Sequence, residues 1–134
     1  MADVLTPDIC VIGGGPGGIA VATGAANLGV SVVLVEEARI GGANLAYGAV
    51  PSKAFIAAAN LYEALRRGPA IGVTGAPLQV NLGKVGEHVR AVVEAAAANV
   101  SAERLAALGV TVVAAKGTFP GRNTGTGGGA TIRP

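Results

Sequence analysis

A glycine-rich turn near the start of the chain has the residue types and spacing of a phosphate-binding loop. Gly13, Gly15 and Gly18 form the pattern G-x-G-x-x-G directly after the apolar run Ile9–Ile12. The acid Glu36 ends a second apolar run at about the 20-residue offset that this motif requires. The first glycine permits the tight turn, the second lets the backbone approach a pyrophosphate, and the third allows close helix packing. A carboxylate at the end of the second strand of such a unit accepts hydrogen bonds from ribose hydroxyls. The pattern favours dinucleotide binding over a glycine-rich turn that binds nothing.

This site needs a strand, a helix and a second strand to position it, and the rest of the chain extends that alternation. We expect strands over 8–12, 31–35 and 110–114, helices over 15–28, 51–67 and 82–108, a loop over 37–50, irregular chain over 70–80, and short strands near 116–119 and 130–133 with a flexible glycine-rich connection over 123–129 between them. The order predicts an α/β fold, a Rossmann-like doubly wound parallel sheet with a small β element at its C-terminal end. The phosphate loop would lie at the carboxyl ends of the strands.

The composition excludes several other classes of protein. The chain has 134 residues, about one domain, and is 51% hydrophobic but only 3% aromatic, so its core must consist of Ala, Val, Ile and Leu. The net charge of +2 is small and the basic residues are scattered, which argues against nucleic-acid binding. The single cysteine, Cys10, allows no internal disulfide and no thiolate zinc site, and its apolar neighbours indicate a buried side chain. We expect no signal peptide and no membrane span, and hence a cytoplasmic protein.

A second motif narrows the interpretation. Gly41 and Gly42 are followed by Gly48-Ala49-Val50-Pro51-Ser52-Lys53. Together with the first glycine loop, this segment resembles the start of the FAD domain in the pyridine nucleotide–disulfide oxidoreductases. That family includes dihydrolipoamide dehydrogenase, glutathione reductase and mercuric reductase, and the resemblance covers almost the whole chain. It implies FAD as the cofactor and residues 1–134 as one FAD-binding domain, partial relative to the complete enzymes.

The resemblance also implies roles for individual residues. Gly41 and Gly42 would let their loop pass close to the pyrophosphate and the flavin. Lys53 corresponds to a lysine near the flavin, and Gly117 would touch the adenine through its backbone. Together with the first motif, the expected cofactor-binding residues are Gly13, Gly15, Gly18, Glu36, Gly41, Gly42, Lys53 and Gly117.

The chain departs from the family at two positions that carry its chemistry. Asn44 and Ala49 stand where the two redox cysteines would be. An amide and a methyl group can neither form a thiolate beside the flavin nor exchange with a disulfide. The sequence therefore predicts no dithiol redox chemistry and no catalytic residues. Natural loss and deliberate removal of the redox site both remain open.

The length is a further departure, because complete members of the family carry a nicotinamide domain and an interface domain. We expect a fragment, a minimal designed version or a truncated relative that self-associates or lacks its partner domains. The first functional hypothesis is an FAD-binding segment of a flavoprotein. One alternative is a flavin-dependent NAD(P)H oxidoreductase, of diaphorase or transhydrogenase type, that acts without redox cysteines. The other is an engineered or relic scaffold with no cofactor.

Overall fold

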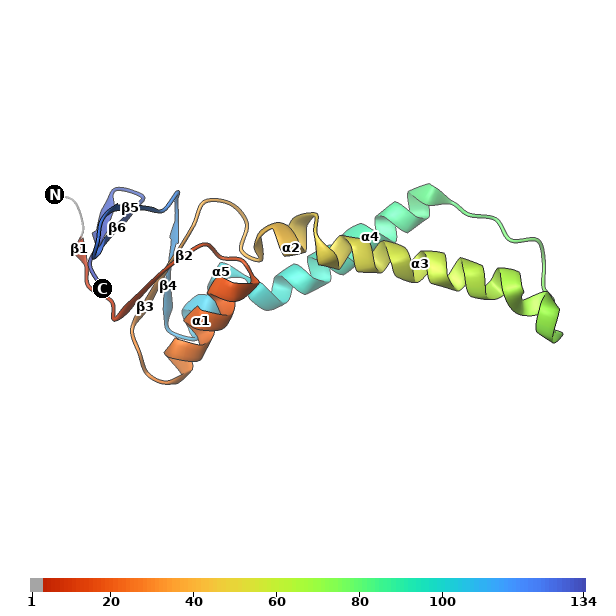
Figure 1. The fold of residues 1–134 in the computed structure, drawn as a ribbon, viewed down its shortest axis with the longest axis horizontal. Coiled ribbons are helices and arrows are strands. Elements are labelled where there is room, and N and C mark those ends of the chain that lie inside the picture. Colours follow the sequence, from red (N-terminus) through yellow and green to blue (C-terminus); the bar gives the residue numbers. More distant parts are fainter. Residues whose placement is uncertain (1–3) are drawn as a thin grey trace.

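The computed structural model describes residues 4–134, and its centre is a parallel sheet of three strands (Figure 1). The strands are β2 (Ile9–Ile12), β3 (Val32–Glu36) and β4 (Val110–Ala114), in the order β2-β3-β4. The central strand carries four consecutive buried residues, Val32 to Val35. A continuous apolar run of this kind is typical of a parallel strand that is covered on both faces. The three expected strands and their α/β arrangement are thereby confirmed.

Helices cover one face of this sheet. Helix α1 (Pro16–Asn27) and the short helix α5 (Ala102–Ala107) pack there, and Leu34 and Leu105 meet in a buried cluster. The helix α1 contributes small side chains such as Ala22, which is fully buried. Small residues let the helix lie close to the strands, which positions its N-terminus at the end of β2.

A second sheet, rather than further helices, covers the opposite face. It contains β1 (Val4–Leu5), β7 (Ala130–Ile132), β6 (Thr124–Gly127) and β5 (Thr118–Gly121), in the order β1-β7-β6-β5. Ile132 is fully buried and packs against Val33 and Val35 of the central strand. The small β element expected at the C-terminal end is therefore a complete layer of the fold.

The expectation for 123–129 differs from the structure. Residues 124–127 are the strand β6, which pairs antiparallel with β5 and with β7. A Cβ at Gly127 would lie 2.8 Å from Cγ1 of Val35, so this glycine permits close layer packing. Within residues 123–129, only Gly128 and Gly129 have positive φ angles, and they form the turn into β7. The glycines suggested a flexible linker because their long-range packing is not visible in the local sequence.

A long helical hairpin extends away from the two sheets (Figure 1). It begins with α2 (Gly42–Ala46) and α3 (Ala49–Arg67), continues through the 3-10 turn η1 (Gly68–Ile71), and returns along α4 (Leu82–Ala97). Residues 37–50, expected to be a loop, thus contain α2 and the first residues of α3. Pro51 lies in the first turn of α3, as expected, and Asn81 caps α4 by accepting a hydrogen bond from the Lys84 N–H at 3.1 Å.

The single helix expected over 82–108 is wrong. Helix α4 ends at Ala97, and the 3-10 turn η2 (Ala98–Val100) leads to Ser101, which has an extended backbone. The Ser101 hydroxyl accepts a hydrogen bond from the Arg104 N–H at 3.3 Å and caps α5. A serine before Ala-Glu is an N-cap signal, and the alanine-rich composition masked it. Within residues 4–134, no helix combines the length and the apolar character that a membrane span requires.

Candidate functional site

The turn from β2 into α1 has the geometry of a phosphate-binding loop. Gly13 has a φ angle of 105°, a conformation that side-chain-bearing residues rarely adopt. Its N–H donates to the carbonyl oxygen of Val35 at 2.8 Å, which ties the turn to β3. Gly15 is the N-cap of α1, and Pro16 is the first residue of the helix. No side chain caps this helix and its first turn holds no acid, so its N-terminal N–H groups and dipole remain available to an anion.

The glycines of the loop divide into two kinds. A Cβ at Gly18 would overlap the carbonyl oxygen of Gly13 and lie 3.1 Å from Cγ1 of Val11, so this position needs glycine for the helix to approach the strand. A Cβ at Gly15 would meet nothing within 4 Å, and the same holds for Gly17. The space beside Gly15 is therefore open for a phosphate group. This difference agrees with the separate roles expected for Gly15 and Gly18.

Glu36 lies at the end of β3 with both carboxylate oxygens held by backbone N–H groups. Its Oε2 accepts a hydrogen bond from Gly14 at 2.5 Å, and its Oε1 accepts one from Ala38 at 2.8 Å. A carboxylate offers about four lone-pair sites, so both oxygens retain the capacity to accept from a hydroxyl pair. The carboxylate is thus oriented by the protein and still able to bind a ribose.

A cavity of about 140 Å³ lies between the ends of the strands. It is lined by Ile12, Gly13, Val35, Glu36, Glu37, Lys116 and Gly117. Gly117 packs closely on Ile12, since a Cβ at this glycine would come 2.8 Å from Cγ2 of Ile12. Pockets for whole drug-sized ligands are about 300–1,000 Å³, so this cavity can hold only one end of a dinucleotide. The structure brings Gly13, Glu36 and Gly117 together around this cavity.

The second glycine motif lies directly on the phosphate loop. The N–H of Gly41 donates to the carbonyl oxygen of Gly14 at 2.7 Å. Gly41 and Gly42 have φ angles of 106° and 59°. A Cβ at Gly42 would lie 3.0 Å from Cα of Gly15. The two glycine motifs are therefore in direct contact in the fold, and the passage of Gly41 and Gly42 beside a pyrophosphate and a flavin stays a prediction.

The structure does not bring Lys53 to this cavity. Lys53 is exposed on α3, and within residues 4–134 its side chain makes no hydrogen bond or ion pair. Asn44 and Ala49, at the positions of the family's cysteines, are exposed on α2 and at the start of α3. Cys10 is partly buried in β2, and desolvation raises the pKa of its thiol. A single cysteine cannot form the dithiol–disulfide pair that the family uses, so Cys10 does not replace that pair.

Sequence reasoning gave little weight to three residues that organise the site. Gly14 is buried and bonds both Glu36 and Gly41, whereas its sequence context indicated either a close backbone approach or simply a small residue. Gly48 has no room for a side chain, because a Cβ would lie 2.9 Å from Cα of Asn44, and this brings α3 against α2. Arg39 forms an ion pair with Glu94 of α4. For Gly14 and Gly48, the presence of a glycine was the one sequence signal that could have indicated a close contact. Nothing in the sequence pairs Arg39 with Glu94.

Comparisons with known proteins agree with this arrangement. The family model for pyridine nucleotide-disulphide oxidoreductases matches residues 7–133. A dihydrolipoyl dehydrogenase of Bacillus subtilis is 38% identical over 94 residues, which cover 70% of this chain and 20% of that protein. The dihydrolipoyl dehydrogenase of Geobacillus stearothermophilus is 38% identical over 84 residues, 63% of this chain and 18% of that protein.

A solved structure is similar over the whole fold. The crystal structure of LpdA from Mycobacterium tuberculosis aligns with a TM-score of 0.71 and 29% identity. The alignment covers 98% of this chain and 29% of LpdA. The chain thus spans less than a third of the length of the relatives that it matches.

Proposed function

The chain belongs to the pyridine nucleotide–disulphide oxidoreductase family, and from that premise we propose that it binds FAD as a segment of a flavoprotein without dithiol chemistry. The observation that carries the proposal is the double contact of Gly14. Its N–H binds Glu36 and its carbonyl oxygen binds Gly41. One residue of the phosphate loop therefore links the ribose acceptor to the second glycine motif.

Each part of the site suits one part of the cofactor. Glu36 would accept hydrogen bonds from the ribose hydroxyls of the adenosine, and the cavity beside Gly117 would take the adenine. The pyrophosphate would lie at the N-terminus of α1, beside Gly15. Gly41 and Gly42 would bring their backbone to the pyrophosphate and the flavin half. Lys53, exposed on α3, lies outside the cavity at Glu36, so any contact that it makes would be with the flavin half of the cofactor.

FAD, when bound, would supply hydride and single-electron transfer. The residues of this chain would bind and orient the cofactor. None of them forms a dithiol that could pass its electrons to a disulfide. Asn44 and Ala49 hold no thiol, and Cys10 lies in a strand of the central sheet. The proposed function is therefore cofactor binding, with no reductase activity toward disulfides.

Titration with three nucleotides tests the proposal. Isothermal calorimetry of the purified chain with FAD, NAD and FMN should show the tightest binding for FAD. FMN lacks the adenosine half, so it should bind much more weakly if Glu36 and the α1 N-terminus carry the affinity. Tighter binding of NAD would overturn the choice of FAD. Absence of binding to all three would favour the scaffold without a cofactor.

A second measurement separates cofactor binding from catalysis. The FAD-loaded chain should consume NADH with a dye acceptor no faster than free FAD does. Turnover well above that of free FAD would favour the flavin-dependent NAD(P)H oxidoreductase instead.

A further inference from the structure

An ion pair connects the helical hairpin to the chain segment beside the phosphate loop. Arg39 follows β3, and Glu94 lies in the last turn of α4. Arg39 Nη1 donates to Oε1 of Glu94 at 3.0 Å, and Nη2 donates to Oε2 at 2.8 Å. This is the bidentate arrangement in which a guanidinium fixes direction as well as distance.

The backbone of the same segment contacts the phosphate loop. The carbonyl oxygen of Arg39 accepts a hydrogen bond from the N–H of Gly42 at 3.1 Å. The N–H of Gly41, between them, donates to Gly14, and Cδ1 of Ile40 lies 2.9 Å from the position of a Cβ on Gly14. Residues 39–42 thus rest on Gly14 on one side and reach α4 through the Arg39 side chain on the other.

The apolar packing of this segment comes from Ile40, which packs against the buried cluster that contains Leu34 and Leu105. A cleft of about 440 Å³ separates the segment from the ends of α4 and α5, and its lining includes Arg39, Ile40, Glu94 and Ser101. The side chains of Arg39 and Glu94 are 50% and 67% exposed, so this direct ion pair lies in contact with solvent. Most exposed ion pairs contribute little to stability, but bidentate pairs are the geometry in which a contribution is measurable.

We propose that the Arg39–Glu94 pair is a positioning contact that holds residues 39–42 against Gly14 and so increases the affinity of the site for its dinucleotide. The inference rests on the proposed function, because it assigns a role to residues beside the same site. Without the pair, only Ile40 and the backbone hydrogen bonds of Gly41 and Gly42 would hold this segment, so more of its ordering would accompany ligand binding and the affinity would fall. Arg39 and Glu94 act through the backbone of Gly41 and Gly42 and need not touch the ligand.

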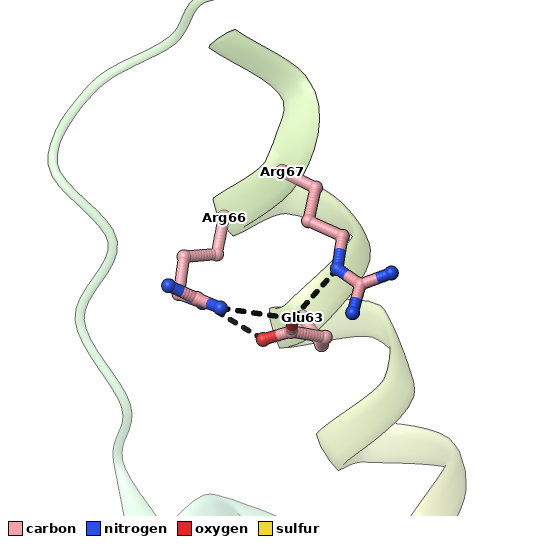
Figure 2. A network of polar contacts seen from close by, with 3 residues as sticks. All are labelled: Glu63, Arg66 and Arg67. Carbon is pink, nitrogen blue, oxygen red and sulfur yellow. Dashed lines mark hydrogen bonds and ion pairs between the residues drawn. The ribbon is translucent and has the colours of Figure 1, made fainter. Parts of the chain in front are cut away.

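The chain offers a matched control on α3. Glu63 accepts hydrogen bonds from Arg66 Nε at 2.8 Å, Arg66 Nη2 at 3.0 Å and Arg67 Nε at 2.8 Å (Figure 2). These partners have the same chemistry but belong to one helix, outside the lining of the cavity at Glu36. Loss of this contact should leave the phosphate loop unaffected.

The experiment measures FAD affinity for Arg39→Gln, Glu94→Gln, the swapped pair Arg39→Glu/Glu94→Arg, and the control Glu63→Gln. Circular dichroism first establishes that each variant is folded at the assay temperature. Each single variant should raise the Kd for FAD about two- to fivefold, and the swapped pair should recover most of this loss. Glu63→Gln should bind as the unmodified chain does. High salt should narrow the difference between the unmodified chain and the single variants.

The outcomes separate this inference from the proposed function. If the unmodified chain binds FAD and both single variants bind it equally well, the positioning role is overturned and the proposed function stands. If the unmodified chain binds no FAD, the proposed function fails, and hydrogen exchange of the Gly41 N–H in the ligand-free protein decides the positioning role. Faster exchange in Arg39→Gln and Glu94→Gln, but not in Glu63→Gln, supports it. Unchanged exchange overturns it.

Discussion

The backbone N–H of Gly14 donates a hydrogen bond to Oε2 of Glu36, with 2.5 Å between the two atoms. The bond joins the middle of the phosphate loop to the acid at the end of the neighbouring strand, 22 residues away in sequence. Because Ala38 binds the other carboxylate oxygen, the orientation of Glu36 is set before any ligand arrives. A site that is ordered in advance loses less conformational entropy on binding.

Replacement of Glu36 should weaken FAD binding strongly. Glu36→Ala removes the acceptor for the ribose and leaves the ribose hydroxyls without this partner in the complex, which should cost about 1–3 kcal/mol of binding free energy. Calorimetry with FAD measures this change. Glu87→Ala is the control, since Glu87 is exposed on α4, lies outside the lining of the cavity at Glu36, and makes no hydrogen bond within residues 4–134. Equal affinity of Glu36→Ala and the unmodified chain would remove Glu36 from the site.

Substitution of Gly18 should damage both stability and binding. In Gly18→Ala the new methyl group would overlap the carbonyl oxygen of Gly13, so the start of α1 must move away from β2. We expect a lower melting temperature and loss of measurable FAD binding. Gly24→Ala is the matched control, because a Cβ there meets nothing within 4 Å and alanine favours a helix interior by about 0.5–1 kcal/mol. A Gly18→Ala variant as stable as Gly24→Ala would contradict the packing argument.

The absence of dithiol chemistry can be tested by restoring the thiols. The unmodified chain should show no thiol-dependent reduction of lipoamide, disulfides or mercuric ion, because Asn44 and Ala49 carry no thiolate. The double variant Asn44→Cys/Ala49→Cys should oxidise to an intrachain disulfide, detected as a loss of two hydrogens by mass spectrometry. The single variants are the controls. Thiol-dependent turnover by the unmodified chain would refute the prediction.

The free energy of unfolding should decrease in acid, because the fold favours the ionised form of the Asp8 carboxylate. Asp8 accepts hydrogen bonds from the hydroxyl and the backbone N–H of Ser31, and these lower its pKa below the ordinary value of 3.8. A lowered pKa in the folded state stabilises the protein above pH 3.8, and this contribution is lost as the pH falls through the folded value. Urea unfolding of the unmodified chain and Asp8→Asn should therefore differ at pH 7 and converge toward pH 2. A difference that grows in acid would contradict the assigned cause.

We expect the chain to self-associate. Leu61 and Leu65 lie one turn apart on α3 and are 63% and 50% exposed, and other large apolar side chains on the hairpin are also exposed. Apolar surface of this kind favours association. Sedimentation velocity should show oligomers that Leu61→Lys/Leu65→Lys reduces. A monomer at all concentrations would refute the association.

FAD at a hundredfold excess over its Kd should stabilise the fold by about 2.7 kcal/mol if only the folded state binds it.

Part of the fold was predictable because its signals are local. Apolar runs identified β2, β3 and β4, and Pro51 and Asn81 correctly indicated the first turn of α3 and the start of α4. The end of α4 was missed because the alanine-rich sequence favours a helix throughout, while Ser101 stops it through one capping hydrogen bond. Strand β6 was missed because Gly125 and Gly127 resemble linker residues unless the opposite layer is known.

The sequence by itself determined the glycine-rich turn at Gly13–Gly18, the acid Glu36 and the family, because these depend on residue types at short, regular spacing. Gly13 and Gly41 occupy backbone conformations that only glycine adopts readily, so the requirement appears directly in the sequence. Only the tertiary structure decided that Gly14 joins Glu36 to Gly41 and that Arg39 reaches Glu94. Those contacts arise where separate strands and helices pack, and no local pattern encodes which side chains meet there.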